Sequence, residues 1–524
     1  MREVDRLTTE KYGIPSILLM ENAAHAVARI VAEKLGGSVK DKSILILCGP
    51  GNNGGDGAAV GRILEGLEGI TFSILIGRVE ETKGDARTNF EILKRLGQNG
   101  SHDLWEITEH SKELADLIQN SKFDLAIDAF FGTGLTRPIE GPYEDILLDL
   151  IEAGIPLVSV DIPTGINADS PELIGPLFSP SITVTFTAPK LATVLPPAAN
   201  LCGELVVAEI GSPQELIREQ PSQLYAAEKM DARNWLERTA FSSTDYKNKR
   251  GHSLIIAGSE SYSGAAVLAG DGAMRSGVGL VTVVTPKSSK DSVASRVLPE
   301  VMVRGVAETD SGAISEGALD EIGDLLSKAD SIAIGCGLSQ TESTKRFVER
   351  VIAGRQQPVI VDADGLNLIS PFRSQEPPKG GTQNLILTPH EGEFMRLLGT
   401  EDKNAIKDRV AAVREFAMKN NVVLVLKGER VLIGEPGGKV VVNPTGNSGL
   451  GKAGNGDTLT GILAGFVAQA AAMKIDIFET VVAAVYIAGM AGDIAEKKYG
   501  KRVMTASDVR ECLCEVFEKI QNER

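Results

Sequence analysis

Short runs of aliphatic and β-branched residues alternate with helix-length segments along almost the whole chain. Such runs predict buried strands when turn-forming residues bound them. The predicted strands are 43–47, 70–76, 123–128, 156–161, 181–186, 253–256, 280–284, 331–334, 358–362, 384–387 and 422–426. Between them, segments such as 57–66, 264–276 and 391–398 predict helices. This alternation indicates βαβ units, so we predict an α/β fold with parallel sheets and helices on both faces.

The carboxyl ends of parallel strands meet at one edge of a sheet, because right-handed crossovers return each strand in the same direction. Ligands of such folds bind along that edge. We therefore expect the residues that directly follow the predicted strands to carry the chemistry.

The alternation breaks once, between Gly211 and about Arg250. This stretch is polar and rich in charge and contains no strand-like run, which is typical of a linker followed by a new N-terminal arm. A chain of 524 residues also exceeds one ordinary domain. We expect a Rossmann-like three-layer α/β/α domain over 1–218 and a second α/β domain over 226–524, with the boundary near residue 220.

The composition narrows the classes of partner. A net charge of −16 argues against nucleic acid or an anionic membrane as the main partner. Five cysteines are few for this length and odd in number, so they predict no disulfide framework. The sequence opens Met-Arg-Glu-Val-Asp-Arg without an apolar signal core, and no run approaches the ~18 apolar residues of a membrane span. We expect a soluble cytoplasmic protein.

The first glycine-rich turn follows the predicted strand 43–47. Gly49, Gly51 and Gly54 match GxGxxG after a strand, a pattern typical of dinucleotide-binding folds. However, Gly77 and Arg78 stand where the ribose-binding acid should close the second strand. Two amides and Asp56 also crowd the turn, which suits a cation near phosphate or sugar hydroxyls. The alternative is a tight turn that uses glycine for its geometry alone.

Two more strand ends carry an acid, Asp128 and Asp161. Together with Asp56 they would place three carboxylates at one edge of the sheet. These groups would repel one another unless a cation or a proton transfer occupied the space. Each alone could be a cap or a turn-former, but together they indicate a site.

Residues 1–215 resemble the epimerase domain of the NAD(P)H-hydrate repair enzymes. The resemblance is carried by 13–16 with 19–24, 52–56, 132–137 and 161–165. It implies that hydrated NADH or NADPH is bound by Asn52, Asn53, Gly54, Gly55, Asp56, Gly132, Thr133, Gly134, Leu135, Thr136, Arg137, Pro138, Tyr143 and Asp161. It also implies a potassium ion on Asn53, Asp128 and Thr164, and proton handling by Asp161.

A second glycine-rich turn, 447–456, runs into an amphipathic helix that is predicted to start near Asp457. Backbone N–H groups and the helix dipole predict an anion site there, and Asp457 adds an acid or base beside it. Gly446, Gly451 and Lys452 match GxxxxGK, but Ala453 replaces the hydroxyl that a P-loop needs for magnesium. The turn therefore argues against a P-loop and for a phosphate site with built-in chemistry.

Four other strand ends of the second domain carry glycine, acid, histidine or lysine. They are 335–338, 362–367, 388–393 and 427–428. His390 lies beside two carboxylates and a glycine, which favours a contact with a ligand over a purely structural role.

The glycine turn and Asp457 resemble the ribokinase-like superfamily, in which the turn is an anion hole and the aspartate is the base for phosphoryl transfer. Within it, residues 230–520 resemble the ADP/ATP-dependent NAD(P)H-hydrate dehydratases, on the motifs 262–266, 361–367, 387–394, 426–428 and 446–461. The resemblance implies that the hydrate contacts Ala265, Gly337, His390 and Asp457. It implies that ADP or ATP with Mg²⁺ is bound by Lys427, Gly428, Glu429, Arg430, Val431, Asn447, Ser448, Gly449, Leu450, Gly451, Lys452, Ala453, Gly454, Asn455 and Gly456. Lys452 and Asn455 depart from the threonine-and-glycine run of the family, which leaves the nucleotide preference open.

Both resemblances point to one pathway. The hypothesis is a bifunctional enzyme that epimerises NAD(P)HX in the first domain and dehydrates the S form in the second, with Asp457 as base. A homo-oligomer is expected. One alternative is a vitamin or sugar kinase with an accessory nucleotide-binding domain, and another is a first domain that only senses NAD-like ligands. An NAD dehydrogenase is disfavoured because the ribose-binding acid is missing.

Overall fold

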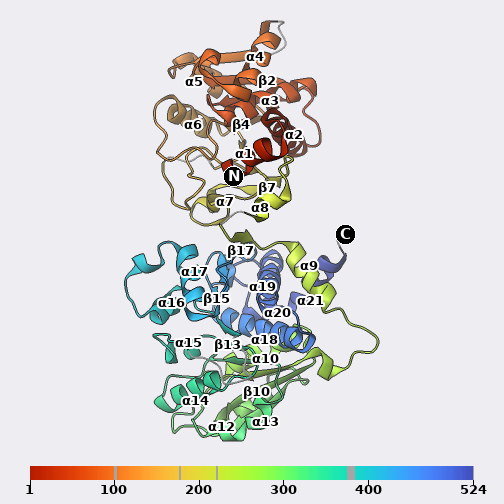
Figure 1. The fold of residues 1–524 in the computed structure, drawn as a ribbon, viewed down its shortest axis with the longest axis vertical. Coiled ribbons are helices and arrows are strands. Elements are labelled where there is room, and N and C mark those ends of the chain that lie inside the picture. Colours follow the sequence, from red (N-terminus) through yellow and green to blue (C-terminus); the bar gives the residue numbers. More distant parts are fainter. Residues whose placement is uncertain (99–102, 176–178, 220–221, 375–383, 523–524) are drawn as a thin grey trace. The chain divides into compact units, whose positions relative to one another are not determined.

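Two sheets of mainly parallel strands build the protein, one in each of two compact units, Met1–Ser222 and Gln223–Arg524. The computed structural model describes residues 1–98, 103–175, 179–219, 222–374 and 384–522, and Figure 1 shows the course of the chain. Residue 220, the predicted boundary, lies outside the described residues. The α/β class expected from the sequence is confirmed, and each predicted strand is present to within two residues at either end.

The first unit contains a seven-stranded parallel sheet in the order β3-β2-β1-β4-β5-β6-β7. The strands are β1 Ser43–Cys48, β2 Ile70–Ile76, β3 Asp103–Ile107, β4 Leu125–Ala129, β5 Leu157–Val160, β6 Ile182–Phe186 and β7 Glu204–Ala208. The order reverses between β1 and β4, so a crevice opens at their carboxyl ends. β3 and β7 were not predicted; both are edge strands with several exposed residues, so they lack the apolar run of a central strand.

Helices cover both faces of this sheet. They are α1 Arg2–Tyr12, α2 Ser16–Lys34, α3 Asn52–Gly66, α4 Gly84–Gln98, α5 Lys112–Asn120, α6 Pro142–Ala153, α7 Leu191–Val194 and α8 Gln214–Arg218. Side chains alternate across a strand, so Ile44 and Ile46 pack with α2, α3 and α4. Leu45 and Leu47 pack with α5 and α6 on the opposite face. Helices on both faces of the sheet give the three-layer α/β/α arrangement that was expected for this domain.

The second unit contains a ten-stranded sheet in the order β11-β10-β9-β12-β13-β14-β15-β16-β17-β8. Strands from β11 to β15 in that order run parallel, whereas β16 pairs antiparallel with both β15 and β17. The strands are β8 Leu224–Ala226, β9 His252–Ile256, β10 Leu280–Pro286, β11 Met302–Val306, β12 Ser331–Ile334, β13 Val359–Val361, β14 Leu385–Leu387, β15 Val423–Leu426, β16 Val431–Gly434 and β17 Val440–Asn443.

The sequence predicted no strand between Gly211 and Arg250, and this prediction is wrong. Strand β8 lies in that stretch and pairs with β17, and helix α9, Lys229–Arg238, follows it. Three residues carry too little periodicity to be recognised. Their partner lies far along the chain, so tertiary pairing decides their conformation.

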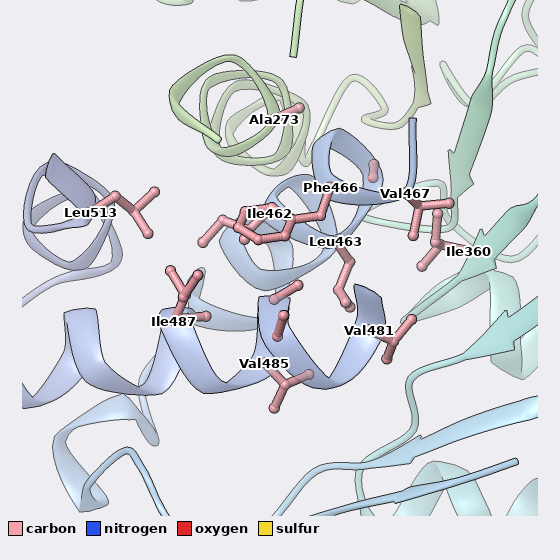
Figure 2. Packing of buried hydrophobic residues seen from close by; sticks show 14 of the residues in the cluster. Ala273, Ile360, Ile462, Leu463, Phe466, Val467, Val481, Val485, Ile487 and Leu513 are labelled. Carbon is pink, nitrogen blue, oxygen red and sulfur yellow. The ribbon is translucent and has the colours of Figure 1, made fainter. Parts of the chain in front are cut away.

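The helices of the second unit include α18, which is buried over most of its length and packs against α10, α19 and α20. They are α10 Ser263–Arg275, α11 Lys290–Ala294, α12 Ala318–Glu321, α13 Gly323–Leu326, α14 Glu342–Ala353, α15 Asp364–Leu368, α16 Glu391–Leu398, α17 Arg409–Asn420, α18 Asn455–Met473, α19 Ile477–Tyr499, α20 Ala506–Glu511 and α21 Leu513–Asn522. Figure 2 shows Ile462, Leu463 and Phe466 of α18 packed among α10, α19 and α21. This packing fixes the helix whose first turn carries Asp457.

Helix α19 is long and apolar enough to cross a membrane by length and composition. The sequence-based statement that no run approaches such a span is therefore wrong. In the structure 72% of its most apolar window is buried inside the unit. Its hydropathy is that of a helix packed on all sides in a protein core.

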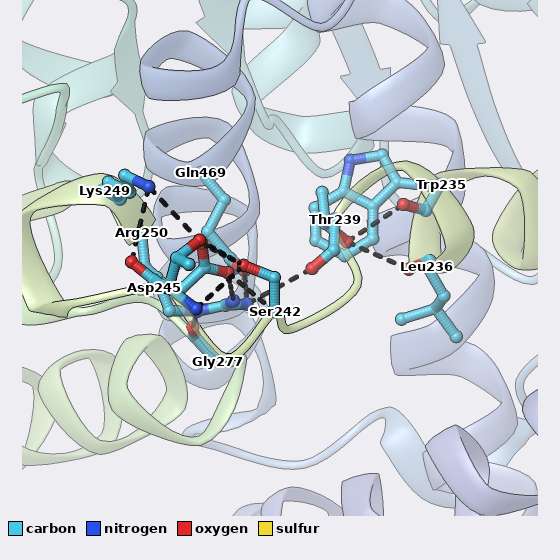
Figure 3. Close-up of polar contacts among 10 residues, drawn as sticks. Trp235, Leu236, Thr239, Ser242, Asp245, Lys249, Arg250, Gly277 and Gln469 are labelled. Carbon is cyan, nitrogen blue, oxygen red and sulfur yellow. Dashed lines mark hydrogen bonds and ion pairs between the residues drawn. The ribbon is translucent and has the colours of Figure 1, made fainter.

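A polar network attaches the segment before β9 to α18 (Figure 3). The guanidinium group of Arg250 is 6% exposed and donates to the carbonyl of Gly277 at 3.2 Å, to that of Thr239 at 3.4 Å and to Gln469 Oε1 at 3.2 Å. Gln469 belongs to α18. The buried guanidinium thus finds acceptors on three elements and holds them together.

Candidate active sites

A cleft of about 560 Å³ opens at the carboxyl ends of β1, β4, β5 and β6 in the first unit. Many predicted substrate-binding residues line it: Asn52, Asn53, Asp56, Gly132, Thr133, Gly134, Leu135 and Asp161. The remaining ones do not: Gly54, Gly55, Thr136, Arg137, Pro138 and Tyr143. Tyr143 instead packs its ring against Phe130 and Phe131. The cleft thus lies at the edge of the sheet where the strand order predicts that a ligand binds.

The first glycine turn brings the start of α3 to this cleft. A side chain at Gly49 would lie 2.1 Å from the carbonyl oxygen of Phe130, and one at Gly54 would lie 1.7 Å from that of Gly49. These close approaches require glycine. Helix α3 then begins at Asn52, so its free N–H groups face the cleft, as an anion site requires.

Asp161 directly follows β5 and forms an ion pair with the ammonium group of Lys190. Lys190 is buried and also donates to Thr185 Oγ1 at 2.8 Å and to the carbonyl of Phe186 at 2.9 Å. The backbone of Asp161 has a φ of 64°, a strained conformation for an aspartate. Neighbouring strands hold it there, since its N–H donates to the carbonyl of Val184 at 2.8 Å.

The sequence analysis missed Lys190, because no feature of the residues around it in the sequence indicates a contact with Asp161, which lies 29 residues earlier. It also missed Asp5 of α1, which lines the cleft. Burial, with the nearby carboxylates of Asp161 and Asp5, raises the pKa of Asp56 well above its ordinary value. The cleft therefore contains a carboxyl group with a raised pKa, Asp56, and an acid paired with an ammonium group, Asp161.

Asp128 lies at the carboxyl end of β4, at the same edge of the sheet, but it does not line the cleft and is fully buried. Its carboxylate accepts from the hydroxyl of Thr164 at 2.6 Å, from the N–H of Thr164 at 2.8 Å and from Ser159 Oγ at 3.0 Å. Burial raises the pKa of Asp128, although these hydrogen bonds act in the opposite direction. Two of the predicted potassium ligands are thus in direct contact.

The third, Asn53, is 8% exposed. Its Nδ2 is buried and has no hydrogen-bond partner among the described residues. Its Oδ1 lies 3.2 Å from the position of a substituent at Gly132, so the amide packs on that loop. Among the described residues no cationic side chain pairs with Asp128.

In the second unit, four elements contribute side chains to one cluster of charged and polar residues. Lys427 Nζ lies 2.6 Å from Asp362 Oδ1 and 3.9 Å from Glu393 Oε2. Thr460 Oγ1 of α18 donates to Asp362 Oδ2 at 2.7 Å. Burial lowers the pKa of Lys427, but the two carboxylates outweigh it and the net shift is upward. Asp362, Glu393 and Thr460 were not among the predicted site residues, although 362–367 and 388–393 were recognised as strand ends.

Asp457 lies beside this group, in the first turn of α18. The helix begins at Asn455, two residues before the predicted start. Burial raises the pKa of Asp457, and a hydrogen bond from the Cys336 thiol acts against the rise. Among the described residues, the N–H groups of Gly456 and Asp457 have no partner, as expected in a first helical turn. A substituent at Gly456 would lie 3.6 Å from Lys427 Nζ and 3.7 Å from Asp362 Oδ2.

The glycine turn before α18 is held by its own side chains. Asp493 of α19 accepts from the N–H of Gly446 and from Asn447 Nδ2, both at 3.0 Å. The ammonium group of Lys452 donates to the carbonyls of Arg502 at 2.6 Å and Met504 at 2.9 Å. A P-loop lysine would instead reach toward the phosphates. The remaining predicted nucleotide-binding residues of this turn are Ser448, Gly449, Leu450, Gly451, Ala453, Gly454, Asn455 and Gly456, and Asn455 Oδ1 is buried without a partner among the described residues.

The other predicted contacts surround the same strand ends. A substituent at Gly337 would lie 3.0 Å from the Cβ of Ala265, so these two residues touch. His390 is half exposed, and its Nδ1 accepts from the N–H groups of Gly392 at 3.0 Å and Glu393 at 3.3 Å. It therefore caps α16, and its Nε2 lies 3.5 Å from Glu393 Oε1.

The predicted nucleotide segment 427–431 leaves β15 and enters β16. A substituent at Gly428 would lie 2.5 Å from Arg409 Nη2, so a larger residue would require that guanidinium group to shift. Arg430 donates to the carbonyl of Pro444 at 2.6 Å. Glu429 and Val431 flank it, and this segment is thereby joined to the chain just before the glycine turn.

Comparison with known proteins gives consistent findings over the whole chain. Residues 253–514 match the family model described as NAD(P)H-hydrate dehydratase, and residues 16–192 match that of the YjeF-related protein N-terminus. The chain is 38% identical to the bifunctional NAD(P)H-hydrate repair enzyme Nnr of Moorella thermoacetica, covering 100% of this chain and 96% of that protein. It is 33% identical to the enzyme of the same name from Thermofilum pendens, covering 96% and 92%.

Among solved structures, the ADP/ATP-dependent NAD(P)H-hydrate dehydratase from Bacillus subtilis, co-crystallised with ATP and Mg²⁺, is 31% identical. The match covers 56% of this chain and 98% of that chain, with a TM-score of 0.48.

Proposed function

The chain belongs to the family of bifunctional NAD(P)H-hydrate repair enzymes, and from this premise we propose how its two units divide the reaction. The first unit interconverts the R and S epimers of hydrated NADH and NADPH. The second unit removes water from the S epimer, with ADP or ATP as phosphoryl donor. The two domains are proposed to be 1–218 and 226–524.

One observation carries the proposal for the second unit: Asp457 lies at the head of α18 beside free backbone N–H groups. Hydroxide is a poor leaving group, so the substrate hydroxyl must first receive a phosphoryl group. Asp457 takes the proton of that hydroxyl as its oxygen attacks the terminal phosphorus of the nucleotide. The N–H groups of Gly456 and Asp457 stabilise the negative charge on the moving phosphoryl group. Phosphate then leaves the ring carbon, and loss of a ring proton completes the net removal of water.

Magnesium fits this site only as part of the nucleotide. The Lys427 ammonium group already lies between the carboxylates of Asp362 and Glu393. Those two acids therefore do not form a vacant cation site. Mg²⁺ is commonly held through substrate phosphates rather than by an all-protein cage. The proposed role of Lys427 is to keep the two carboxylates from repelling the phosphates.

The potassium ion proposed for the first unit fits the donor set. Carboxylate, hydroxyl and amide oxygens from Asp128, Thr164 and Asn53 are the hard ligands that such a cation takes. The buried carboxylate of Asp128 has no cationic partner among the described residues, which supports a bound cation. When bound, that ion would supply positive charge next to the phosphate-binding turn.

Proton handling in the first unit is assigned to Asp161 and Asp56. Asp161 is oriented by Lys190 and by its position at the end of β5. Asp56 is the carboxyl group with the raised pKa. Two carboxyl groups in different environments can supply an acid and a base to the same substrate.

The function is tested by adding the purified chain to hydrated NADH, with and without ADP or ATP. NADH absorbance should return completely when nucleotide is present, because the R form is converted to the S form as the latter is consumed. Asp457→Asn should prevent all recovery, whereas Asp161→Asn should leave only the S fraction recoverable. A stable phosphorylated product would instead indicate a kinase. Recovery limited to the S fraction in the wild type would mean that the first unit only binds its ligand.

The setting of the protein is also proposed. Its five cysteines are free, and its net charge of −16 does not favour nucleic acid or anionic membranes. These properties support a cytoplasmic enzyme that acts on small molecules. A homo-oligomer is proposed, and light scattering after size exclusion would test it.

A further inference from the structure

Helix α1 forms one wall of the cleft in the first unit. Met1, Arg2 and Asp5 line the cleft, and one turn of helix brings them to the same side. The far end of the helix is fixed to α8, where Lys11 lies 4.0 Å from Glu219 and the Tyr12 hydroxyl donates to Glu215. The matching part of the family model begins at residue 16. The proposed site residues do not include any residue of this helix.

The charges around the cleft are unbalanced. Four carboxyl groups line it: Asp5, Asp56, Asp85 and Asp161. Of the described residues on its wall, only Lys190 and Arg2 are lysine or arginine. Lys190 is committed to Asp161, Thr185 and Phe186. Arg2 is therefore the basic side chain that remains for an anion.

The position of Arg2 suits that task. Its Nη2 donates to the carbonyl of Thr133 at 3.0 Å and lies 3.1 Å from the position of a substituent at Gly134. The guanidinium group thus lies against the loop that was predicted to bind substrate. It has five N–H donors in a fixed plane, and one bond to a carbonyl leaves the others for oxygen atoms of a ligand.

The substrate class follows from the function proposed above, on which this step depends. A hydrated dinucleotide carries a diphosphate, and an acidic cleft repels it unless donors offset the charge. We propose that Arg2 binds a phosphate group of the dinucleotide, so that α1 is a substrate-binding element of the first unit. The N-terminus of α3 would contact the same diphosphate from the other side.

The test measures exchange of the separated R epimer of NADHX by chromatography, without nucleotide, so that the second unit is idle. Arg2→Gln should raise KM about 10- to 100-fold, the range expected for losing a hydrogen bond between charged groups, while kcat changes little. Arg2→Lys keeps the charge and should recover part of the loss. The matched control is Arg6→Gln on the same helix, an exposed arginine that pairs with Glu3 and Glu10 and does not line the cleft.

Two further readouts separate binding from folding. KM of the wild type should rise with ionic strength more steeply than KM of Arg2→Gln, because the variant has lost the attraction that salt screens. Dehydration of the S epimer with ATP should be unchanged in every variant. A KM for Arg2→Gln within about twofold of the Arg6→Gln value would overturn the role of Arg2. Failure of the wild type to exchange epimers would instead overturn the proposed function.

Discussion

Replacing Lys427 by methionine should destabilise the second unit by about 3–5 kcal/mol near neutral pH, the usual cost of removing one partner of a buried ion pair. The Lys427 ammonium lies 2.6 Å from Asp362 and 3.9 Å from Glu393, and the two acids are 2% and 7% exposed. At an effective dielectric constant of about 20 these attractions amount to about 6 and about 4 kcal/mol before desolvation is subtracted. Methionine has a similar length, so the variant loses the charge without leaving a large cavity.

The loss should grow with pH. Burial raises the pKa of Glu393, and Lys427 opposes that rise. Without the lysine the folded-state pKa rises further above the unfolded value, so the folded state holds its proton longer. Stability is then lost as pH increases from the unfolded pKa through the folded one. The deficit of Lys427→Met should therefore be larger at about pH 8 than at about pH 5.5.

Tryptophan fluorescence can report on each unit separately. The chain has 2 tryptophans, Trp105 in the first unit and Trp235 in the second. Trp235 is 3% exposed and stacks on Phe466 with 4.0 Å between ring centroids. In a Trp105→Phe background, urea unfolding followed by Trp235 measures the second unit alone. With an m-value of about 3 kcal/mol/M, the midpoint should fall by about 1–1.7 M.

The matched control is Lys419→Met, an exposed position on α17, which should change stability by less than about 0.5 kcal/mol. The reasoning is refuted if Lys427→Met costs less than about 1 kcal/mol, or if its deficit is the same at both pH values. Either result would mean that Asp362 and Glu393 do not need the lysine to remain buried.

Three other predictions concern the proposed chemistry. Asp457→Asn should slow dehydration by about 10²–10⁴-fold, while its affinity for ADP, measured by calorimetry, should change little. A base must be ionised, and burial raises the pKa of Asp457, so the wild-type rate of dehydration should fall on acidification at a higher pH than it would with an ordinary aspartate. Gly456→Ala should keep the melting temperature but weaken nucleotide binding, because its methyl group would lie 3.6 Å from Lys427 Nζ. Gly454→Ala should instead lower the melting temperature, because Gly454 has a φ of 91° and a substituent there would lie 2.6 Å from Leu268. Asp56 acts as an acid only while it is protonated, and burial raises its pKa, so the rate of epimerisation by the wild type should decline as pH rises through that raised pKa. Asp56→Asn should remove this decline together with most of the rate. An unchanged pH profile in the variant would contradict the assignment.

Most of the fold could be predicted because its central strands are apolar on both faces. β1, β4 and β5 are buried at nearly every position, which gives a mostly aliphatic run in the sequence. Edge strands β3 and β7 lack that signal, since several of their residues face solvent. β8 is three residues long and exists because β17 pairs with it. Local pattern could not reveal it.

The site residues divide in the same way. Turn geometry indicated Asp56, Asp161 and Asp457 as candidates, because each follows a strand or glycine turn at the sheet edge where ligands of such folds bind. The lysine that pairs with Asp161 was missed, since Lys190 comes from the loop after another strand and only the folded sheet brings the two together. Lys452 is the opposite case, and the sequence already argued against the P-loop that its spacing suggests. Its spacing suggests a phosphate contact, yet its ammonium group is used by the carbonyls of Arg502 and Met504.

The two sites share an electrostatic arrangement that no single motif encodes. In each, an acid at the end of a parallel strand, Asp161 or Asp362, forms an ion pair with a lysine that follows another strand of the same sheet. In each, a second carboxyl group lies near the start of a helix that follows a glycine turn, Asp56 just after the first turn of α3 and Asp457 in the first turn of α18, and burial raises its pKa. The ion pair fixes the position of the first acid, and the Coulombic effect of that acid adds to burial in raising the pKa of the second carboxyl group. A group whose pKa is raised in this way exchanges protons nearer to neutral pH. By this reasoning we expect Asp56 to exchange a proton in the first unit as Asp457 does in the second, with Asp161 as the other proposed proton-handling group of the first unit and Asp362 as a neighbouring charge in the second.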